Sequence, residues 1–182
     1  MGGDKPRQLL AGTPLLRYPI AALARAGLPV AVVTKPGCSL PRPLPPAVRV
    51  LLEGDSDHHP LCGIVHALRT LEAEAIVVLA CDMPFVSTAL LRALLAQAAG
   101  VDAVVPVIGE QPEPLHAVYR PSCLPAIEAA LAAGRKRLLA FFDAVRVRYV
   151  PEAELRRWDP ELRSFLNVNW PDDLARARAL GT

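Results

Sequence analysis

The most informative segment of the chain is Ala75-Ile76-Val77-Val78-Leu79-Ala80-Cys81-Asp82-Met83-Pro84. It is a continuous apolar run, rich in β-branched residues, that stops at an acid and then a proline. Such a run predicts a strand that is buried on both faces, as in a parallel sheet covered by helices. Pro84 cannot donate to a ladder, so the strand is expected to end before it.

Asp82 is therefore predicted at the carboxyl end of a central strand, where open α/β sheets bind their ligands. A carboxylate at this edge can anchor a divalent cation that carries phosphates. Mg²⁺ keeps several waters and takes one or two protein carboxylates, so a single acid is sufficient. An acid before a proline is also common as a turn residue, and the segment alone leaves both interpretations open.

Helix and strand signals alternate along the rest of the chain. Helices are expected at 14–26, 61–71, 87–100, 121–133, 138–144 and 171–180, and strands at 28–34, 48–52, 101–108, 115–119 and 145–150. This alternation predicts an α/β fold with a doubly wound, mostly parallel sheet and helices on both faces. No internal repeat or domain boundary is evident, so residues 1–182 are expected to form one domain.

Composition excludes several classes of protein. Hydrophobic residues make up 52% of the 182 residues, which predicts a folded core rather than disorder. No apolar run approaches the roughly eighteen residues of a membrane span, and the polar start carries no secretory signal. The net charge of +2 is too small to indicate nucleic-acid binding. The four cysteines form no CxxC pair, which favours reduced thiols in a cytoplasmic protein over a disulfide framework or a zinc site.

Three further segments carry functional signals. The chain begins with Met1-Gly2-Gly3-Asp4-Lys5, and Pro60-Leu61-Cys62-Gly63-Ile64 opens a predicted helix with a small residue at its tight point. Near the end, Phe165-Leu166-Asn167-Val168-Asn169-Trp170-Pro171-Asp172-Asp173-Leu174 leads into the last predicted helix. Together with Cys81-Asp82-Met83-Pro84, and in this order, they resemble the molybdenum cofactor guanylyltransferase family of nucleotidyltransferases. The segments 113–119 and 134–138 are similar to family segments as well.

The resemblance implies transfer of GMP from GTP to the molybdopterin cofactor, with Mg²⁺ as the cofactor and pyrophosphate as the second product. It implies that Lys5 contacts phosphate and that Asp82 holds Mg²⁺ and the nucleotide, so these two are the expected catalytic residues. The physical chemistry agrees, because nucleotidyl transfer is an in-line displacement in which the protein positions groups and neutralises charge. A lysine is a suitable point charge for phosphate oxygens.

The resemblance also implies further nucleotide contacts. Thr34 occupies the position where relatives often have asparagine, and Gly63 lies at the tight helix start. The acid after the 48–52 strand should touch the nucleotide, and its register leaves Glu53 and Asp55 as alternatives.

The acceptor side is expected to involve two asparagines and two arginines. The resemblance places Asn167 and Asn169 beside the acceptor and the metal, although either could simply cap the following helix. Arg135 and Arg137 belong to a basic cluster that could hold an anionic pterin phosphate. Such a cluster is otherwise a solvated face.

One departure from the family pattern concerns the start of the chain. Family members begin with an apolar strand and a glycine-rich LAGG-x-S-x-R loop, whose backbone N–H groups would cradle the triphosphate. This sequence starts after that loop, which suggests a gene start placed too late or a truncated copy. We expect the two neighbours of the absent strand each to lack a pairing partner. We also expect roughly fifteen to twenty added upstream residues to restore GTP binding.

Two other functions remain open from the sequence. One is a cytidylyltransferase or another sugar-type nucleotidyltransferase on the same scaffold. The other is a non-catalytic domain that binds the pterin or a partner such as a molybdoenzyme or its chaperone, which the absent loop favours.

Overall fold

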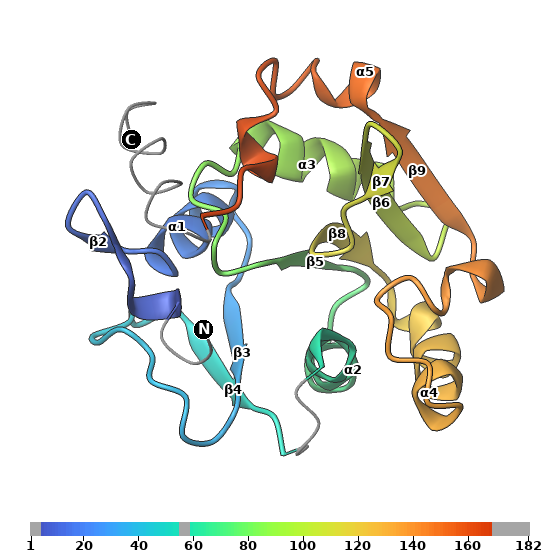
Figure 1. Ribbon diagram of the computed structural model, residues 1–182, viewed down its shortest axis with the longest axis horizontal. Coiled ribbons are helices and arrows are strands. Elements are labelled where there is room, and N and C mark those ends of the chain that lie inside the picture. The colour runs from blue at the N-terminus through green and yellow to red at the C-terminus, as the bar shows by residue number, and fades with distance from the viewer. Residues whose placement is uncertain (1–4, 55–58, 169–182) are drawn as a thin grey trace.

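The computed structural model describes residues 5–54 and 59–168 of the protein, which form one larger β-sheet, two two-stranded sheets and the helices around them (Figure 1). The α-helices are α1 (Arg17–Arg25), α2 (Pro60–Thr70), α3 (Thr88–Ala96), α4 (Leu124–Ala132) and α5 (Glu152–Leu155). The strands are β1 (Leu9–Leu10), β2 (Thr13–Pro14), β3 (Ala31–Thr34), β4 (Arg49–Leu52), β5 (Ile76–Leu79), β6 (Ala103–Ile108), β7 (Gln111–Pro112), β8 (His116–Tyr119) and β9 (Val147–Pro151). Short 3₁₀ turns are η1 (Lys5–Arg7), η2 (Pro121–Cys123), η3 (Phe142–Ala144) and η4 (Arg163–Phe165). The helix expected at 171–180 lies outside the described residues.

The larger sheet has the order β5-β8-β6-β7, with β9 paired to the side of β6. β8 runs antiparallel to both β5 and β6, whereas β9 is parallel to β6. β5, β6 and β9 therefore point the same way, and β8 runs against them. β3 and β4 form a separate parallel pair. The predicted α/β class is confirmed, with β8 antiparallel to β5 and β6 and the short β7 antiparallel to β6.

The two faces of the larger sheet are covered by different helices. On one face Ala103, Val105 and Tyr119 belong to a buried cluster with residues of α2 and α4. On the other face Val104 and Val118 pack with residues of α3 and α5. This alternation along β6 and β8 is the period of two that a strand imposes, and it places helices on both faces as predicted.

β5 differs from the expectation of a strand buried on both faces. Only Ile76 is buried, whereas Val77, Val78 and Leu79 are partly exposed. Within the described residues β5 pairs only with β8, and β3 pairs only with β4. Their remaining edges adjoin a cleft that residues of both strands line. This is the arrangement expected of two strands that lack a shared neighbour.

The segment 138–144 was expected to be a helix, but it forms turns followed by η3. Phe141 and Phe142 are consecutive and both buried, with ring centroids 4.8 Å apart in an edge-to-face contact. Successive residues of a helix do not point to the same face, so a tight turn is needed to direct both rings into the core. Aromatic packing therefore overrides the local helix signal.

A strand supplied to the space between β3 and β5 is expected to stabilise the protein. We would fuse about six β-branched apolar residues, the usual length of a strand, and a glycine-rich connector before Met1. Pairing of the two open edges and burial of Val77, Val78 and Leu79 should raise the Tm by about 4 °C or more. Thermal unfolding measures the change, and a glycine-serine extension of equal length is the control. Equal Tm values for the two extensions would contradict this prediction.

Candidate functional site

The ends of three strands lie at one wide cleft. Thr34 ends β3, Glu53 directly follows β4, and Asp82 lies three residues beyond the end of β5. The sequence placed Asp82 at the strand end itself, but β5 stops at Leu79, and the loop carries the acid further. The cleft has a volume of about 1120 Å³. Its polar lining also includes Lys5, Lys35, Gly63, Glu113 and Asn167.

Lys5 and Asp82 contact each other in this cleft. The Lys5 Nζ lies 2.9 Å from the Asp82 Oδ2 in an ion pair between residues 77 positions apart. Asp82 is buried, and its Oδ1 makes no hydrogen bond within the described residues. The structure therefore brings together the two residues that the sequence predicted to be catalytic, and leaves one carboxylate oxygen available to a ligand.

Glu53 forms a second acidic position in the cleft. Its backbone N–H donates to the Thr34 carbonyl oxygen at 2.8 Å, and its side chain is buried. The Glu53 Oε1 makes no hydrogen bond within the described residues, and the Lys35 Nζ lies 3.8 Å from it. A Cβ at Gly63 would lie 3.6 Å from the Glu53 Oε2, so the helix start packs closely beside this carboxylate. Asp55, the alternative acid, lies outside the described residues.

Asn167 lines the cleft beside the Asp82 loop. The backbone N–H of Val168 donates to the Asp82 carbonyl oxygen at 3.0 Å, which ties the asparagine segment to the acidic loop. Asn169 lies outside the described residues. Arg135 and Arg137 are exposed and do not line the cleft, and the Arg135 Nη1 donates to the Ala140 carbonyl oxygen at 2.9 Å.

The segment before Asn167 is held by a set of buried polar contacts. The Asp159 carboxylate accepts the backbone N–H of Ser164 at 2.8 Å. The Ser164 hydroxyl in turn accepts the backbone N–H of Ser87 at 2.8 Å. The Phe165 ring packs on His116 with centroids 4.7 Å apart. These contacts fix the chain that presents Asn167 to the cleft.

Lys35 and Glu113 also line the cleft, although the sequence motifs predicted no role for either residue. Lys35 directly follows β3, so the same carboxyl-end rule that selected Thr34 could have found it. Glu113 lies in a segment that resembles the family. Its position at the cleft depends on the turn before β8, which no local sequence pattern predicts.

Cys81 neighbours Asp82 without sharing its chemistry. Burial, with a smaller contribution from the Asp82 carboxylate, raises the pKa of the Cys81 thiol to about 11. A thiol with such a pKa stays protonated at neutral pH, so Cys81 is a packing residue and not a nucleophile.

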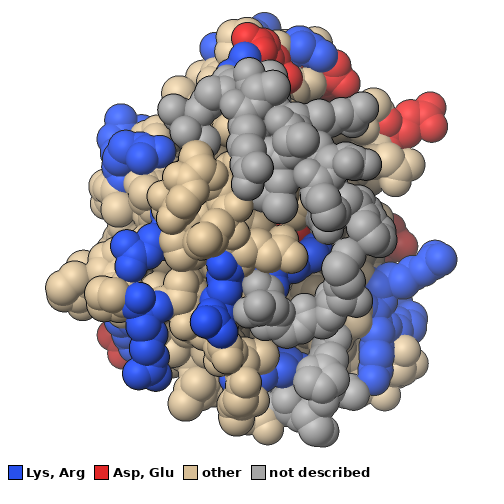
Figure 2. Space-filling model, turned by 60° about the vertical axis from the view of Figure 1, so that its left-hand side comes forward, with Lys and Arg blue, Asp and Glu red and all other residues tan. Residues whose placement is uncertain are grey.

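The face on the side of β2 and β3 carries Lys and Arg side chains at several places around its middle, and acidic side chains lie mainly toward its margin (Figure 2). Such a face favours anionic ligands at long range.

Within residues 5–54 and 59–168, no group of three or more His, Cys, Asp or Glu side chains is arranged to hold a metal ion. In the same residues, no helix has the length and apolar character that crossing a membrane requires.

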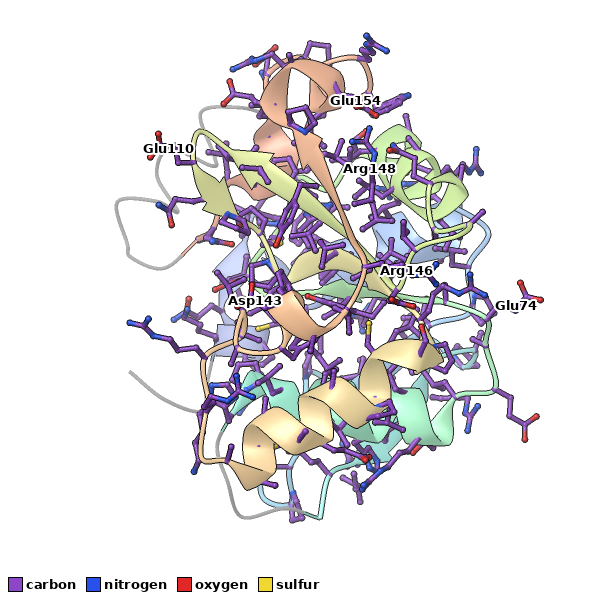
Figure 3. All side chains as sticks on the ribbon, turned by 90° about the vertical axis from the view of Figure 1, so that its right-hand side faces the viewer. Glu74, Glu110, Asp143, Arg146, Arg148 and Glu154 are labelled. Carbon is purple, nitrogen blue, oxygen red and sulfur yellow. The ribbon has the colours of Figure 1, made fainter. Side chains whose placement is uncertain are left out.

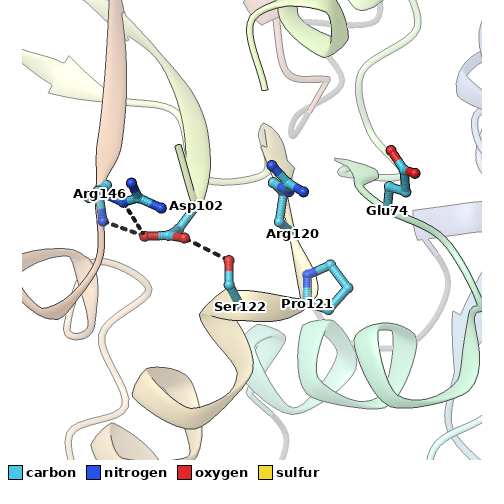
Figure 4. Close-up of a pocket in the computed structure, with 6 residues that line it drawn as sticks. All are labelled: Glu74, Asp102, Arg120, Pro121, Ser122 and Arg146. Carbon is cyan, nitrogen blue, oxygen red and sulfur yellow. Dashed lines mark hydrogen bonds and ion pairs between the residues drawn. The ribbon is translucent and has the colours of Figure 1, made fainter. Parts of the chain in front are cut away.

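The opposite end of the sheet has a smaller hollow of about 320 Å³. Arg146 and Arg148 project from the β9 region, and the Arg148 Nη2 lies 2.8 Å from the Glu154 Oε2 (Figure 3). In the hollow, the Asp102 carboxylate accepts the Ser122 hydroxyl at 2.7 Å and the Arg146 backbone N–H at 2.8 Å (Figure 4). The Ser122 hydrogen bond, followed by that of Arg146, lowers the pKa of Asp102. Both oxygens of the Asp102 carboxylate already accept hydrogen bonds, so Asp102 has a structural role: it connects the segments that carry Ser122 and Arg146.

Two solved structures share the fold of this chain. One is molybdopterin-guanine dinucleotide biosynthesis protein A from Archaeoglobus fulgidus, with a TM-score of 0.80 and 29% identity over 97% of this chain and 90% of that one. The other is 2-C-methyl-D-erythritol 4-phosphate cytidylyltransferase from Thermus thermophilus, with a TM-score of 0.72 and 22% identity over 98% of this chain and 94% of that one. The fold is therefore that of the nucleotidyltransferases.

The family follows from the sequence comparisons. The model of the MobA-like NTP transferase domain matches residues 1–149, and the chain belongs to this family. A probable molybdenum cofactor guanylyltransferase from Pelotomaculum thermopropionicum is 41% identical over 66% of this chain and 59% of its own length. A molybdenum cofactor guanylyltransferase from Desulfosudis oleivorans is 38% identical over 65% of this chain and 59% of its own length. The chain thus spans about three-fifths of the length of these relatives.

His116 is expected to make the stability of the protein depend on pH. It is fully buried, neither ring nitrogen makes a hydrogen bond within the described residues, and burial outweighs nearby Ser164 and Asp159 to lower its pKa from 6.5 to about 4. The unfolded chain therefore takes up this proton more readily, so the contribution is full above pH 6.5 and is lost as the pH falls toward 4. Urea unfolding should show a loss of about 3 kcal/mol from this residue between about pH 7 and pH 4.

The control for this prediction is His116→Phe, which can still pack against Phe165 but has no proton to bind. Its free energy of unfolding should fall less steeply over the same pH range. Identical slopes for the variant and the original protein would show that His116 does not titrate in this way.

Proposed function

We propose that this protein is a Mg²⁺-dependent guanylyltransferase that transfers GMP from GTP to the molybdopterin cofactor and releases pyrophosphate. The observation that carries the proposal is the Lys5–Asp82 ion pair, 2.9 Å long, in a cleft formed at the ends of β3, β4 and β5. Relatives named molybdenum cofactor guanylyltransferase, 38% and 41% identical, support the choice of reaction.

The residues of the cleft are compatible with a magnesium ion. Mg²⁺ prefers oxygen ligands and keeps several waters, so it needs few protein groups. The Asp82 Oδ1, which makes no hydrogen bond within the described residues, would hold the ion, and Asn167 lines the same space. When bound, Mg²⁺ supplies charge neutralisation and polarisation at the α-phosphate.

The other side chains would bind and orient the nucleotide. Lys5 has an ammonium group beside the metal site and would move part of its contact from Asp82 to phosphate oxygens. The buried Glu53 Oε1 has an unused acceptor position that suits a hydroxyl or N–H group of the nucleoside. Thr34 and Gly63 border the same part of the cleft. Holding the reactants in line supplies most of what such a reaction requires.

Asn167, which lines the cleft, and Asn169 would contact the acceptor. Arg135 and Arg137 are exposed, and in this proposal they bind the acceptor's phosphate outside the cleft. The protein would then act in the cytoplasm as a single domain and deliver its product to a molybdoenzyme or its chaperone.

A second candidate is a non-catalytic domain that binds the pterin or a protein partner. The observation that favours it is the open space between β3 and β5, where residues of both strands line the cleft instead of pairing with a common neighbour. A cytidylyltransferase is the third candidate, because a cytidylyltransferase shares the fold with a TM-score of 0.72.

The nucleotide preference can be tested by thermal unfolding with GTP, CTP or ATP in the presence of Mg²⁺. A ligand at about 100 times its Kd stabilises the folded state by about 2.7 kcal/mol, so GTP should raise the Tm clearly more than the other two. Samples with EDTA serve as the control. Stabilisation by CTP alone would reject the guanylyl assignment, and no response to any nucleotide would favour the binding domain.

Asp82→Asn should separate a catalytic from a structural role of this residue. The amide preserves the size of the side chain but loses the charge that binds the metal, so GMP transfer should fall by about 100-fold or more. Without GTP, the Tm should change by no more than about 4 °C. Glu74→Gln, at an exposed acid outside the cleft, is the matched control. A large loss of Tm with little loss of transfer would show that Asp82 is structural.

A further inference from the structure

Glu113 has a rigid backbone and lines the cleft. It lies between Pro112 and Pro114, its N–H donates to the Pro106 carbonyl oxygen at 2.9 Å, and its carbonyl oxygen accepts the His116 N–H at 3.0 Å. Both backbone polar groups are therefore satisfied, and proline restricts the chain on each side. Because the backbone is fixed in this way, ligand binding by the Glu113 side chain requires little further ordering of the main chain.

The direction of β8 brings Glu113 to the same end of the sheet as Asp82. β5 and β8 are antiparallel, with Leu79 opposite His116, and the Ala80 N–H continues the ladder by donating to the Leu115 carbonyl oxygen at 2.9 Å. The chain that follows β5 and the chain that precedes β8 thus leave the sheet at the same end of the two strands. Glu113 is therefore a second acid on the Asp82 side of the cleft.

Glu113 differs from the other acids of the cleft in its partners. Asp82 contacts Lys5 at 2.9 Å, and Glu53 has Lys35 at 3.8 Å. Within the described residues, no side chain forms a hydrogen bond or ion pair with the Glu113 carboxylate. Burial alone raises its pKa, because no neighbouring charge offsets the loss of solvent. A half-buried carboxylate without a partner is costly, and such groups in clefts are frequent ligand contacts.

We propose that Glu113 binds a ring edge with an N–H beside an amino group, the edge that guanine and pterin share. This inference rests on the function proposed above, which brings both rings to this cleft. The two oxygens of a carboxylate match two parallel N–H donors, and such paired, charge-assisted hydrogen bonds are both strong and selective. A site built to pair with an amino group also rejects an analogue that lacks it.

The test uses matched ligands that differ in the amino group. Pterin and lumazine differ by an amino and an oxo group on the pyrimidine ring, and GTP and ITP differ by the presence or absence of the amino group. Fluorescence titration of the full chain should show about tenfold tighter binding of the amino form in at least one pair. Glu113→Gln should abolish that preference, and Glu110→Gln should preserve it. Glu110 is an exposed acid on the neighbouring β6–β7 hairpin (Figure 3).

Each outcome has a defined meaning. A preference in the pterin pair assigns Glu113 to the acceptor, and a preference in the GTP pair assigns it to the nucleotide. Equal binding within both pairs, or an unchanged preference in Glu113→Gln, overturns the proposal, as does weaker Mg²⁺ binding by that variant. A Glu113-dependent preference without GMP transfer would reject the proposed function alone, whereas GMP transfer without any preference would reject only the role of Glu113.

Discussion

Strand direction is the constraint on which the cleft depends. β3 and β4 are parallel, so Thr34 and Glu53 emerge at one edge, and the Glu53 N–H bonds to the Thr34 carbonyl oxygen. β8 runs opposite to β5, so the residue that precedes β8 and the residue that follows β5 also share an edge. Glu113 and Asp82 reach the cleft for this reason. Strand pairing therefore determines that these residues, which are far apart in the chain, lie close together.

The lysines of the cleft have two roles that follow from the same charges. Without a ligand, Lys5 balances the Asp82 carboxylate, and Lys35 lies near that of Glu53. In the proposed function, the cation of a bound nucleotide would pair with a carboxylate, and the phosphates would pair with a lysine ammonium group. Binding then exchanges partners and leaves no buried charge alone, which avoids the large desolvation cost of an unpaired ion.

Local signals predicted much of the fold and part of the site. A helix was expected over 87–100, and the Ser87 Oγ accepts the Leu90 N–H at 3.3 Å at the start of α3. That Lys5 and Asp82 lie close together was also anticipated, since both were expected to act at one site. The exposure of Val78 was not, because burial of a strand depends on neighbours that are distant in sequence. Long-range packing also determined the turns at 138–144, which a helix pattern cannot reveal.

The open edges of β3 and β5 divide the protein into regions of unequal packing. The buried clusters around β6, β8 and β9 include large side chains such as Tyr119 and Phe141, whereas β3 is held by the smaller cluster that contains Ile20 and Val32. Thr34 and Glu53 belong to the region with the smaller cluster, and Asp82 and Glu113 lie beside the region with the larger one. Regions with fewer buried contacts open at lower free energy, so a ligand that contacts both sides of the cleft would stabilise the weaker region by joining it to the stronger one. In the proposed function, ligand binding and folding would therefore be linked through the space between β3 and β5.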